Sequence, residues 1–211
     1  MGNNEVGGAG LNWKIRMVPI RVSADKADPV PSDVAAAFDY AIVSRASIVA
    51  LKEINGIKIA DLESSMRPGK LSKAGFLGDK ERLLEVMAAD NDWIVQARLT
   101  HQEIACHLRV LAVVSRRESK PFIYHGTRLR AKIIQYDGFQ ESPFNDGTKA
   151  STDVALENLD NGERIWYSSL VPMMVERYGF YESKGTLYRV DPKAVVKVLP
   201  FLTAKKQAGR K

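Results

Sequence analysis

The sequence predicts an α+β fold, in which a mainly helical part precedes a small antiparallel sheet with two short C-terminal helices. Two observations lead to this prediction. Apolar residues recur at helical spacing through much of the first 120 residues. After residue 120 the chain instead shows short runs of alternating apolar and polar residues, separated by turn-forming residues, which is the pattern of antiparallel strands. Helices and strands that are segregated along a chain are typical of the α+β class.

Four segments with different expected structures divide the chain. Residues 1–11 are rich in Gly and Asn and are expected to be disordered, whereas residues 12–120 form the mainly helical part. Residues 121–202 form the antiparallel β-rich part, and residues 203–211 form a basic tail. The tail has four basic residues and no acidic one, so it supplies +4 of the formal net charge of +6 and leaves +2 for the rest. Most of the net positive charge therefore lies in the tail.

The helical part contains five expected elements. Residues 12–22 alternate enough for an edge strand, since a proline within them excludes a central position. Residues 32–54 have apolar residues at helical spacing and predict the longest helix, which Asn-Gly ends. We expect a short strand over 56–64, a basic glycine-containing loop over 65–78 and a second helix over 79–99.

The β-rich part combines hairpin and helix signals. Asn-Gly within residues 152–168 predicts a hairpin, and a helix follows over 168–179, with Ser169 as a possible cap and a glycine at its end. Residues 186–190 predict a strand, and Asp-Pro opens a final helix over 192–202. The long loop before the hairpin contains two phenylalanines, so we expect it to be pinned to the core or to contact a partner.

A capping box marks the start of a helix near residue 100. Thr100 and Glu103 form the pattern Thr-x-x-Glu, in which the two side chains cap the first backbone N–H groups. The run Leu-Thr-x-x-Glu-Ile-Ala around it resembles the first helix of bacterial helix-turn-helix DNA-binding proteins, and the resemblance extends over residues 99–118. It implies that Arg116 and Arg117 lie on a recognition helix that faces DNA, where arginine pairs with guanine or phosphate.

The turn between the two helices decides this interpretation. The resembling proteins usually have glycine there, whereas this chain has Arg109 and no other turn-forming residue nearby. The alternative is one continuous helix from His101 to Ser115 with a single apolar face. The sequence leaves both interpretations open.

The residues after this helix predict a hairpin that would serve as a wing. Residues 122–124 and 128–134 are expected to pair around His125-Gly126. Because side chains alternate along a strand, one face of the second strand would be basic and the other apolar. The alternative is a solvated outer face of an ordinary sheet. The predicted nucleic-acid-binding residues are Arg109, Arg116, Arg117, Arg128, Arg130, Lys132, Lys205 and Lys206.

The run Tyr-His-Gly-Thr suggests a second interpretation. Residues 124–139 are similar to the opening of some ADP-ribosyltransferase-type enzymes, in which a histidine of this motif holds the nicotinamide ribose. The resemblance implies NAD as cofactor, with His125 binding it and Tyr167 stacking on the nicotinamide. It requires a helix over residues 127–136, whereas the wing requires a strand, and the alternation favours the strand.

Several classes of protein and site are excluded. The single cysteine, Cys106, excludes an internal disulfide and a cysteine-rich zinc site. His101 and His107 do not share a helix face, so no metal site is expected. No apolar run reaches the roughly 18 residues of a membrane span, and the first residues lack the pattern of a secretion signal. We therefore expect a cytoplasmic protein with no membrane partner.

The leading functional prediction is a cytoplasmic DNA-associated protein that binds phosphate through its basic helix, strand and tail, without a cofactor. One alternative is an ADP-ribosyltransferase-like enzyme that uses NAD. Another is a structural or protein-interaction domain, with an aromatic surface around residues 139–144 and 166–181. The sequence leaves enzymatic activity open and favours a non-enzymatic role.

Overall fold

The computed structural model describes residues 44–118 and 120–208, the last four by their backbone alone. Three predictions lie outside the described residues: the disordered segment over 1–11, the edge strand over 12–22 and the first part of the helix over 32–54. The buried hydrophobic side chains form one cluster, whose members come from both the helical and the β-rich part.

Seven helices and six strands occur in the described residues, which confirms the α+β class. The helices are α2 Arg45–Val49, α3 Ile59–Ser65, α4 Leu83–Gln96, α5 His101–Ser115, α6 Val171–Tyr178, α7 Pro192–Val198 and α8 Phe201–Ala208. The strands are β1 Glu53–Ile54, β2 Ile57–Lys58, β3 Phe122–Tyr124, β4 Thr127–Glu141, β5 Lys149–Asn158 and β6 Arg164–Ser168.

Strands β3 to β6 form one antiparallel sheet in which each strand pairs with the next along the chain. His125 and Gly126 make the turn between β3 and β4, with φ angles of +48° and +77° that suit a two-residue hairpin. The connection from β5 to β6 contains Gly162, at φ +76°. The structure thus confirms the hairpin predicted over 152–168 and the strand predicted over 128–134.

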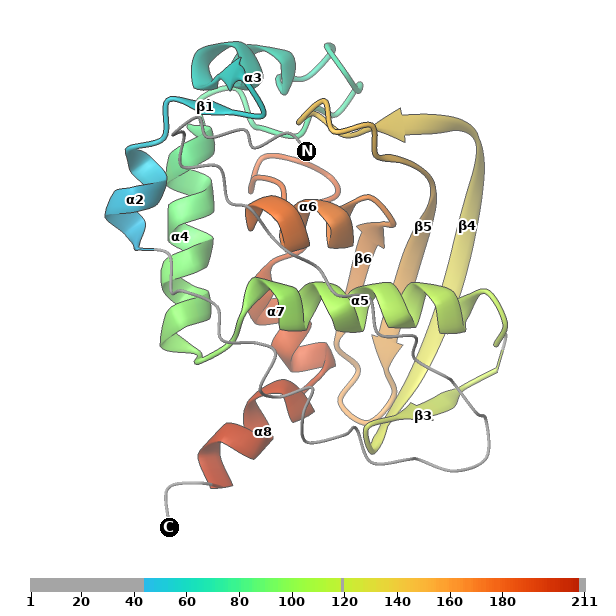
Figure 1. Cartoon of the computed structure of the whole chain (residues 1–211). Helices are drawn as coiled ribbons and strands as arrows, with labels where there is room; N and C mark the ends of the chain where they lie inside the picture. Colours follow the sequence, from blue (N-terminus) through green and yellow to red (C-terminus); the bar gives the residue numbers. More distant parts are fainter. Residues whose placement is uncertain (1–43, 119, 209–211) are drawn as a thin grey trace, which may run out of the picture. The chain divides into compact units, whose positions relative to one another are not determined.

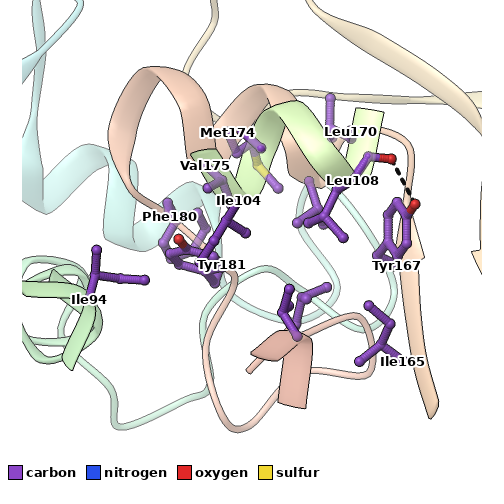
Figure 2. Packing of buried hydrophobic residues seen from close by; sticks show 14 of the residues in the cluster. Ile94, Ile104, Leu108, Ile165, Tyr167, Leu170, Met174, Val175, Phe180 and Tyr181 are labelled. Carbon is purple, nitrogen blue, oxygen red and sulfur yellow. Dashed lines mark hydrogen bonds between the residues drawn. The ribbon is translucent and has the colours of Figure 1, made fainter. Parts of the chain in front are cut away.

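Helix α5 crosses one face of this sheet (Figure 1). Its N-terminus is capped as predicted, because Thr100 Oγ1 accepts the Glu103 N–H at 3.1 Å. Tyr167 of β6 is fully buried beneath the helix, and its hydroxyl donates a hydrogen bond of 2.8 Å to the Leu108 carbonyl (Figure 2). The buried side chains at this contact include Ile104, Leu108 and Leu111 of α5 and Leu129, Val154, Leu156 and Tyr167 of the sheet.

Helix α6 packs beside α5 and is the helix predicted over 168–179. Its N-cap is Leu170, not Ser169 as predicted, and the Leu170 side chain makes no capping hydrogen bond. Gly179 ends the helix in the left-handed region, at φ +65°. The half-buried Glu176 of α6 pairs with Arg109 of α5 at 2.7 Å, so charge as well as apolar packing joins the two helices.

The loop between β4 and β5 is pinned to the core, one of the two outcomes expected for it. Phe144 is buried and its ring stacks on Tyr178 with 4.0 Å between centroids. Asp146 accepts hydrogen bonds from Arg177 Nη1 at 2.9 Å and from the Tyr178 hydroxyl at 3.0 Å. These bonds, together with those from Thr148, lower the pKa of Asp146 to about 2 even though burial acts in the opposite direction.

The strand predicted over 56–64 is wrong for most of its length. Only Ile57–Lys58 pairs as a strand, and α3 follows immediately. Ile59, Leu62 and Met66 are buried at helical spacing, so a helix buries their side chains on one face where a strand would divide them between two.

The C-terminal end of the helix predicted over 32–54 is also wrong. Helix α2 ends at Val49, and β1 and β2 then form a short hairpin. Asn55 and Gly56 make its turn at φ +53° and +75°, so Asn-Gly here joins two strands rather than ending a helix.

Two further predictions near the C-terminus need correction. Residues 186–190 form a turn at Leu187 and Tyr188 within otherwise irregular backbone rather than a strand, because Arg189 and Thr186 make side-chain contacts within the protein and no strand of the described residues pairs with the segment. The helix predicted over 192–202 is divided into α7 and α8 at Leu199, since Pro200 lacks the N–H that would continue it. Helix α8 then extends into the basic tail.

Alanine substitutions at Gly179 and Gly162 test how tightly the end of α6 packs against α5. A Cβ atom at Gly179 would lie 3.0 Å from His101 Nε2, whereas a Cβ at Gly162 has nothing within 4 Å. Alanine at either position costs roughly 1–2 kcal/mol for a left-handed backbone. We expect Gly179→Ala to lower the free energy of unfolding by a further 1–3 kcal/mol or so, the usual cost of overpacking. Urea denaturation of both variants measures the difference, and equal losses would contradict the packing described.

Candidate functional site

A large bulge in β4 shapes the candidate site. β4 and β5 pair continuously from Leu129↔Asn158 to Gln135↔Thr152, and the next pair is Gln140↔Ala150. Between these points residues 136–139 of β4 stand opposite Ser151 alone. Unpaired residues bend a strand, and bulges are frequent next to functional sites.

A cavity of about 250 Å³ lies beside this bulge. Its walls come from the loop after α3, from the bulge, from the adjoining ends of β5 and β6, and from the segment that follows α6. Gln140 Nε2 donates to the Leu71 carbonyl at 3.3 Å and so joins the bulged strand to the loop after α3. The lining residues are Ser72, Gly75, Phe76, Tyr136, Gly138, Phe139, Gln140, Ala150, Ser151, Thr152, Asp153, Ser168, Leu170, Glu182 and Tyr188.

Hydrogen bonds donated by backbone N–H groups hold two of these walls together. The Gly78 N–H donates to Ser183 Oγ at 2.8 Å, and the Ser183 N–H donates to the Phe76 carbonyl at 3.2 Å. The Glu81 carboxylate accepts the N–H groups of Gly78 and Gly185, both at 3.1 Å. A Cβ atom at Gly185 would lie 3.0 Å from the Gly78 Cα, so the two loops approach as closely as glycine allows.

A buried ion pair fixes the segment that carries Glu182. Arg189 Nη2 and Nη1 donate to the two carboxylate oxygens of Asp90 at 2.6 and 3.0 Å, and about a tenth of each side chain is exposed. Arg189 Nη1 also donates to the Glu182 carbonyl at 2.5 Å. This bidentate pair holds the Glu182 backbone at φ +62°, a conformation that residues other than glycine rarely adopt.

Asp153 is the first of two carboxyl groups in the cavity wall. It is 4% exposed, and its Oδ2 accepts hydrogen bonds from the Tyr136 hydroxyl at 3.0 Å and from Trp166 Nε1 at 2.9 Å. The bond to Asp153 raises the pKa of Tyr136 to about 12. Asp153 therefore orients two aromatic side chains at the edge of the cavity.

Glu182 is the second carboxyl group. It is 2% exposed, and its Oε2 accepts a hydrogen bond of 3.1 Å from Thr186 Oγ1. Burial raises its pKa to about 8, the nearby charge of Asp153 acts in the same direction, and the bond from Thr186 opposes them. A pKa of about 8 means that the Glu182 carboxyl is mainly protonated at neutral pH.

The helix-turn-helix prediction for residues 99–118 is wrong in its central feature. Helix α5 continues through Arg109, where the turn was expected, and the single-helix alternative has the observed bounds His101–Ser115. Leu108 and Leu111 are both buried on the face that meets the sheet, and no residue between them favours a turn. Arg109 pairs with Glu176 of α6 instead.

The other predicted phosphate-binding residues with described side chains lie on the surface and do not line the cavity, although Arg116 donates a hydrogen bond to the lining residue Thr152 at 3.3 Å. Arg128 pairs with Asp160 at 3.5 Å and Arg130 with Glu157 at 3.3 Å. Six of the predicted nucleic-acid-binding residues have described side chains, and all six are exposed: Arg109, Arg116, Arg117, Arg128, Arg130 and Lys132. Lys205 and Lys206 lie in α8, where only the backbone is described.

The structure does not place His125 and Tyr167 as the ADP-ribosyltransferase resemblance implies. Residues 127–136, where that resemblance requires a helix, belong to strand β4. Tyr167 has no exposed surface and donates its hydroxyl hydrogen to α5. His125 occupies a hairpin turn and its ring stacks on Phe201 with 4.6 Å between centroids.

Sequence reasoning did not identify the two cavity carboxyls as a pair. Neither Asp153 nor Glu182 is among the site residues that the sequence predicts. Alternation along β5 and β6 is the one local signal, because it places Asp153 and Trp166 on the same face. Glu182 carries no comparable signal, since its position depends on Arg189, which contacts its carbonyl and pairs with distant Asp90, and on its neighbour Ser183, which accepts the N–H of distant Gly78.

Comparison of the chain with protein-family models finds no match, and comparisons with curated proteins and with solved structures find none either. Among the described helices, none has the length and apolar character needed to cross a membrane. In the same residues no group of three or more His, Cys, Asp and Glu side chains is arranged to hold a metal ion. Function is therefore inferred from the site itself.

The buried Glu182 predicts a distinctive pH dependence of stability. Its pKa is raised by burial from 4.5 to about 8, so between these values the native state binds more protons than the unfolded chain, and the free energy of unfolding falls as pH rises. Buried His101 acts in the opposite sense, because burial lowers its pKa from 6.5 to about 4 and stability falls as pH drops through that range.

Above pH 6.5 most of the opposing His101 contribution is complete, so the Glu182 effect dominates. We expect the protein to lose about 2 kcal/mol between pH 6.5 and 8.5 and Glu182→Gln to abolish that loss. Urea denaturation at several pH values measures it, and Glu163→Gln at an exposed position is the matched control. A Glu182→Gln variant with the slope of the unmodified protein would show that Glu182 is not protonated in the native state.

Proposed function

We propose that the protein binds a small organic ligand in the cavity beside the β4 bulge. The observation that carries this proposal is that two almost fully buried carboxyl groups, Asp153 and Glu182, line one cavity together with several aromatic rings. Burying an ionisable group is costly, and such groups gather at binding and catalytic sites. A few convergent polar groups in an otherwise apolar pocket are characteristic of small-molecule sites.

The construction around the cavity supports the same proposal. Glu182 has a left-handed backbone that the Asp90–Arg189 ion pair holds in place. Strained conformations of this kind persist where the surrounding structure enforces them, and they cluster at ligand sites. The cavity volume of about 250 Å³ lies just below the range of drug-sized pockets and therefore suits a small ligand.

A second candidate function is association with nucleic acid through the outer face of β4. Arg128, Arg130 and Lys132 are exposed there and alternate with buried residues, which is the arrangement predicted for a phosphate-binding strand. The acids Glu157 and Asp160 reduce the positive charge of this face, so binding would be weak and strongly dependent on salt. Both candidates are compatible with the predicted cytoplasmic location, and neither requires catalysis.

Trp166 provides a direct test of ligand binding. Because its indole N–H donates to Asp153, a ligand that enters the cavity should shift the Trp166 indole signal in a ¹H–¹⁵N spectrum and leave that of Trp93 unchanged. We expect a mixed fragment library to contain such ligands, and Asp153→Asn to weaken their binding by about tenfold or more, as for a hydrogen bond to a charged group. Trp166→Phe assigns the signal. A library without any hit, or hits that Asp153→Asn leaves unchanged, would contradict the proposal.

The nucleic-acid candidate is tested by duplex DNA binding at low salt. We expect the triple variant Arg128→Gln, Arg130→Gln, Lys132→Gln to weaken binding by about tenfold and to reduce the salt dependence, since each phosphate contact contributes about 0.9 to the slope. The matched control is Lys205→Gln with Lys206→Gln in the tail. Binding that disappears in the tail variant and persists in the triple variant would assign it to the tail and exclude β4.

A further inference from the structure

We infer that the ligand of the cavity is an organic cation, an amine or N-methylated ammonium group held between the carboxyl groups of Asp153 and Glu182 and a wall of aromatic rings. This inference rests on the proposed function and names the chemical class of its ligand.

The charge of the cavity wall is the first reason. Its lining residues include two carboxyl groups and no lysine, arginine or histidine. Arg189 donates to Asp90 and to a backbone carbonyl, so its charge is already balanced. Arg116 Nη2 donates a hydrogen bond of 3.3 Å to Thr152 Oγ1. Side chains of neighbouring residues in a strand point to opposite faces of the sheet, so this contact lies on the face opposite to the Asp153 side chain. An anion would meet only negative or neutral groups among these residues.

The state of Glu182 is the second reason. Its Oε2 accepts the Thr186 hydroxyl hydrogen, whereas Oε1 is not among the fully buried atoms that lack a partner and is therefore accessible from the cavity. The side chain is 2% exposed and lines the cavity, so little of it reaches bulk water. A ligand that brings an N–H group or a positive charge would complete this shell.

The aromatic wall is the third reason. Rings of Phe76, Tyr136, Phe139 and Tyr188 line the cavity, and the faces of such rings attract cations. The hydrogen bonds of Asp153 to Tyr136 and Trp166 fix two rings beside the negative charge. Phe139 is 73% exposed, so its ring is available to contact a ligand at the cavity. Carboxylates combined with several rings form the kind of cage that binds quaternary ammonium groups.

Cation binding is coupled to the proton on Glu182. The groups that face this carboxyl are Asp153, the Thr186 hydroxyl and Tyr188, while Arg189 contacts its backbone carbonyl. With a pKa of about 8, Glu182 is roughly a tenth ionised at pH 7 and nine-tenths ionised at pH 9. If the ionised form binds the cation, affinity rises about tenfold over this interval and a proton is released on binding below pH 8.

The test compares three probes of nearly the same shape and different charge: choline, the uncharged 3,3-dimethylbutan-1-ol and the anion 3,3-dimethylbutanoate. Isothermal titration calorimetry on the full chain at pH 7 and pH 9, in buffers of different ionisation enthalpy, gives affinity and proton release. We expect choline to bind at least tenfold more tightly than either analogue, with about tenfold higher affinity at pH 9 than at pH 7.

Two variants make the test specific. Glu182→Gln should remove the pH dependence and the proton release, and Phe139→Ala, at an exposed position that folding does not need, should weaken choline binding severalfold. An analogue that binds as tightly as choline and shifts the Trp166 indole signal would overturn the cation inference while leaving the proposed function in place. Failure of all three probes, and of the fragment library, would overturn both.

Discussion

The described structure depends on the packing of α5 across one face of the β4–β6 sheet. Tyr167 is the centre of this contact, because its ring fills the space beneath the helix and its hydroxyl satisfies the Leu108 carbonyl. A helix with its apolar face on a sheet has no room for a turn in the middle of that face, which is why α5 runs unbroken through Arg109. The same packing sets the direction of every side chain in the sheet. Residues that alternate with the buried ones, among them Asp153 and Trp166, must face the other way.

The candidate site arises where this regular sheet ends. The bulge at residues 136–139 turns Tyr136 and Phe139 out of the ladder, and the loops around Gly78 and Gly185 close the other side. The Asp90–Arg189 pair then places Glu182 in the wall. Each of these features is unfavourable taken alone: unpaired strand residues, a left-handed glutamate and a carboxyl out of water. Their concentration in one place is the physical reason to regard the cavity as functional.

Short sequence patterns correctly predicted those elements whose backbone conformation is determined by residues close together in the chain. The capping box at Thr100, the hairpin around Gly162 and the glycine that ends α6 each specify a backbone conformation within a few residues. Alternation also predicted β4 correctly. Predictions failed where tertiary contacts decide. Residues 186–190 have a strand-like composition, yet Arg189 is drawn to Asp90, almost a hundred residues earlier in the chain.

The candidate site was less predictable than the fold for the same reason. Asp153 and Glu182 approach one another only after the sheet, α6 and the loop after α3 have assembled, and no spacing in the sequence records that approach. The predicted basic residues are close together in the sequence. In the structure Arg109, Arg128 and Arg130 have acidic partners that are distant from them in the sequence. A cluster of basic residues in the sequence predicts a positively charged surface only when the acidic residues that pair with them in the fold are known as well.

The protonation of Glu182 is the point on which this account of the cavity depends most. A ¹³C-detected titration of the Glu182 carboxyl in the full chain measures it directly. We expect an apparent pKa near 8 in the free protein, which falls when tetramethylammonium is added. A pKa close to the ordinary value of 4.5, unchanged by the added cation, would mean that Glu182 is hydrated and unconnected with a cation site, and it would contradict the account.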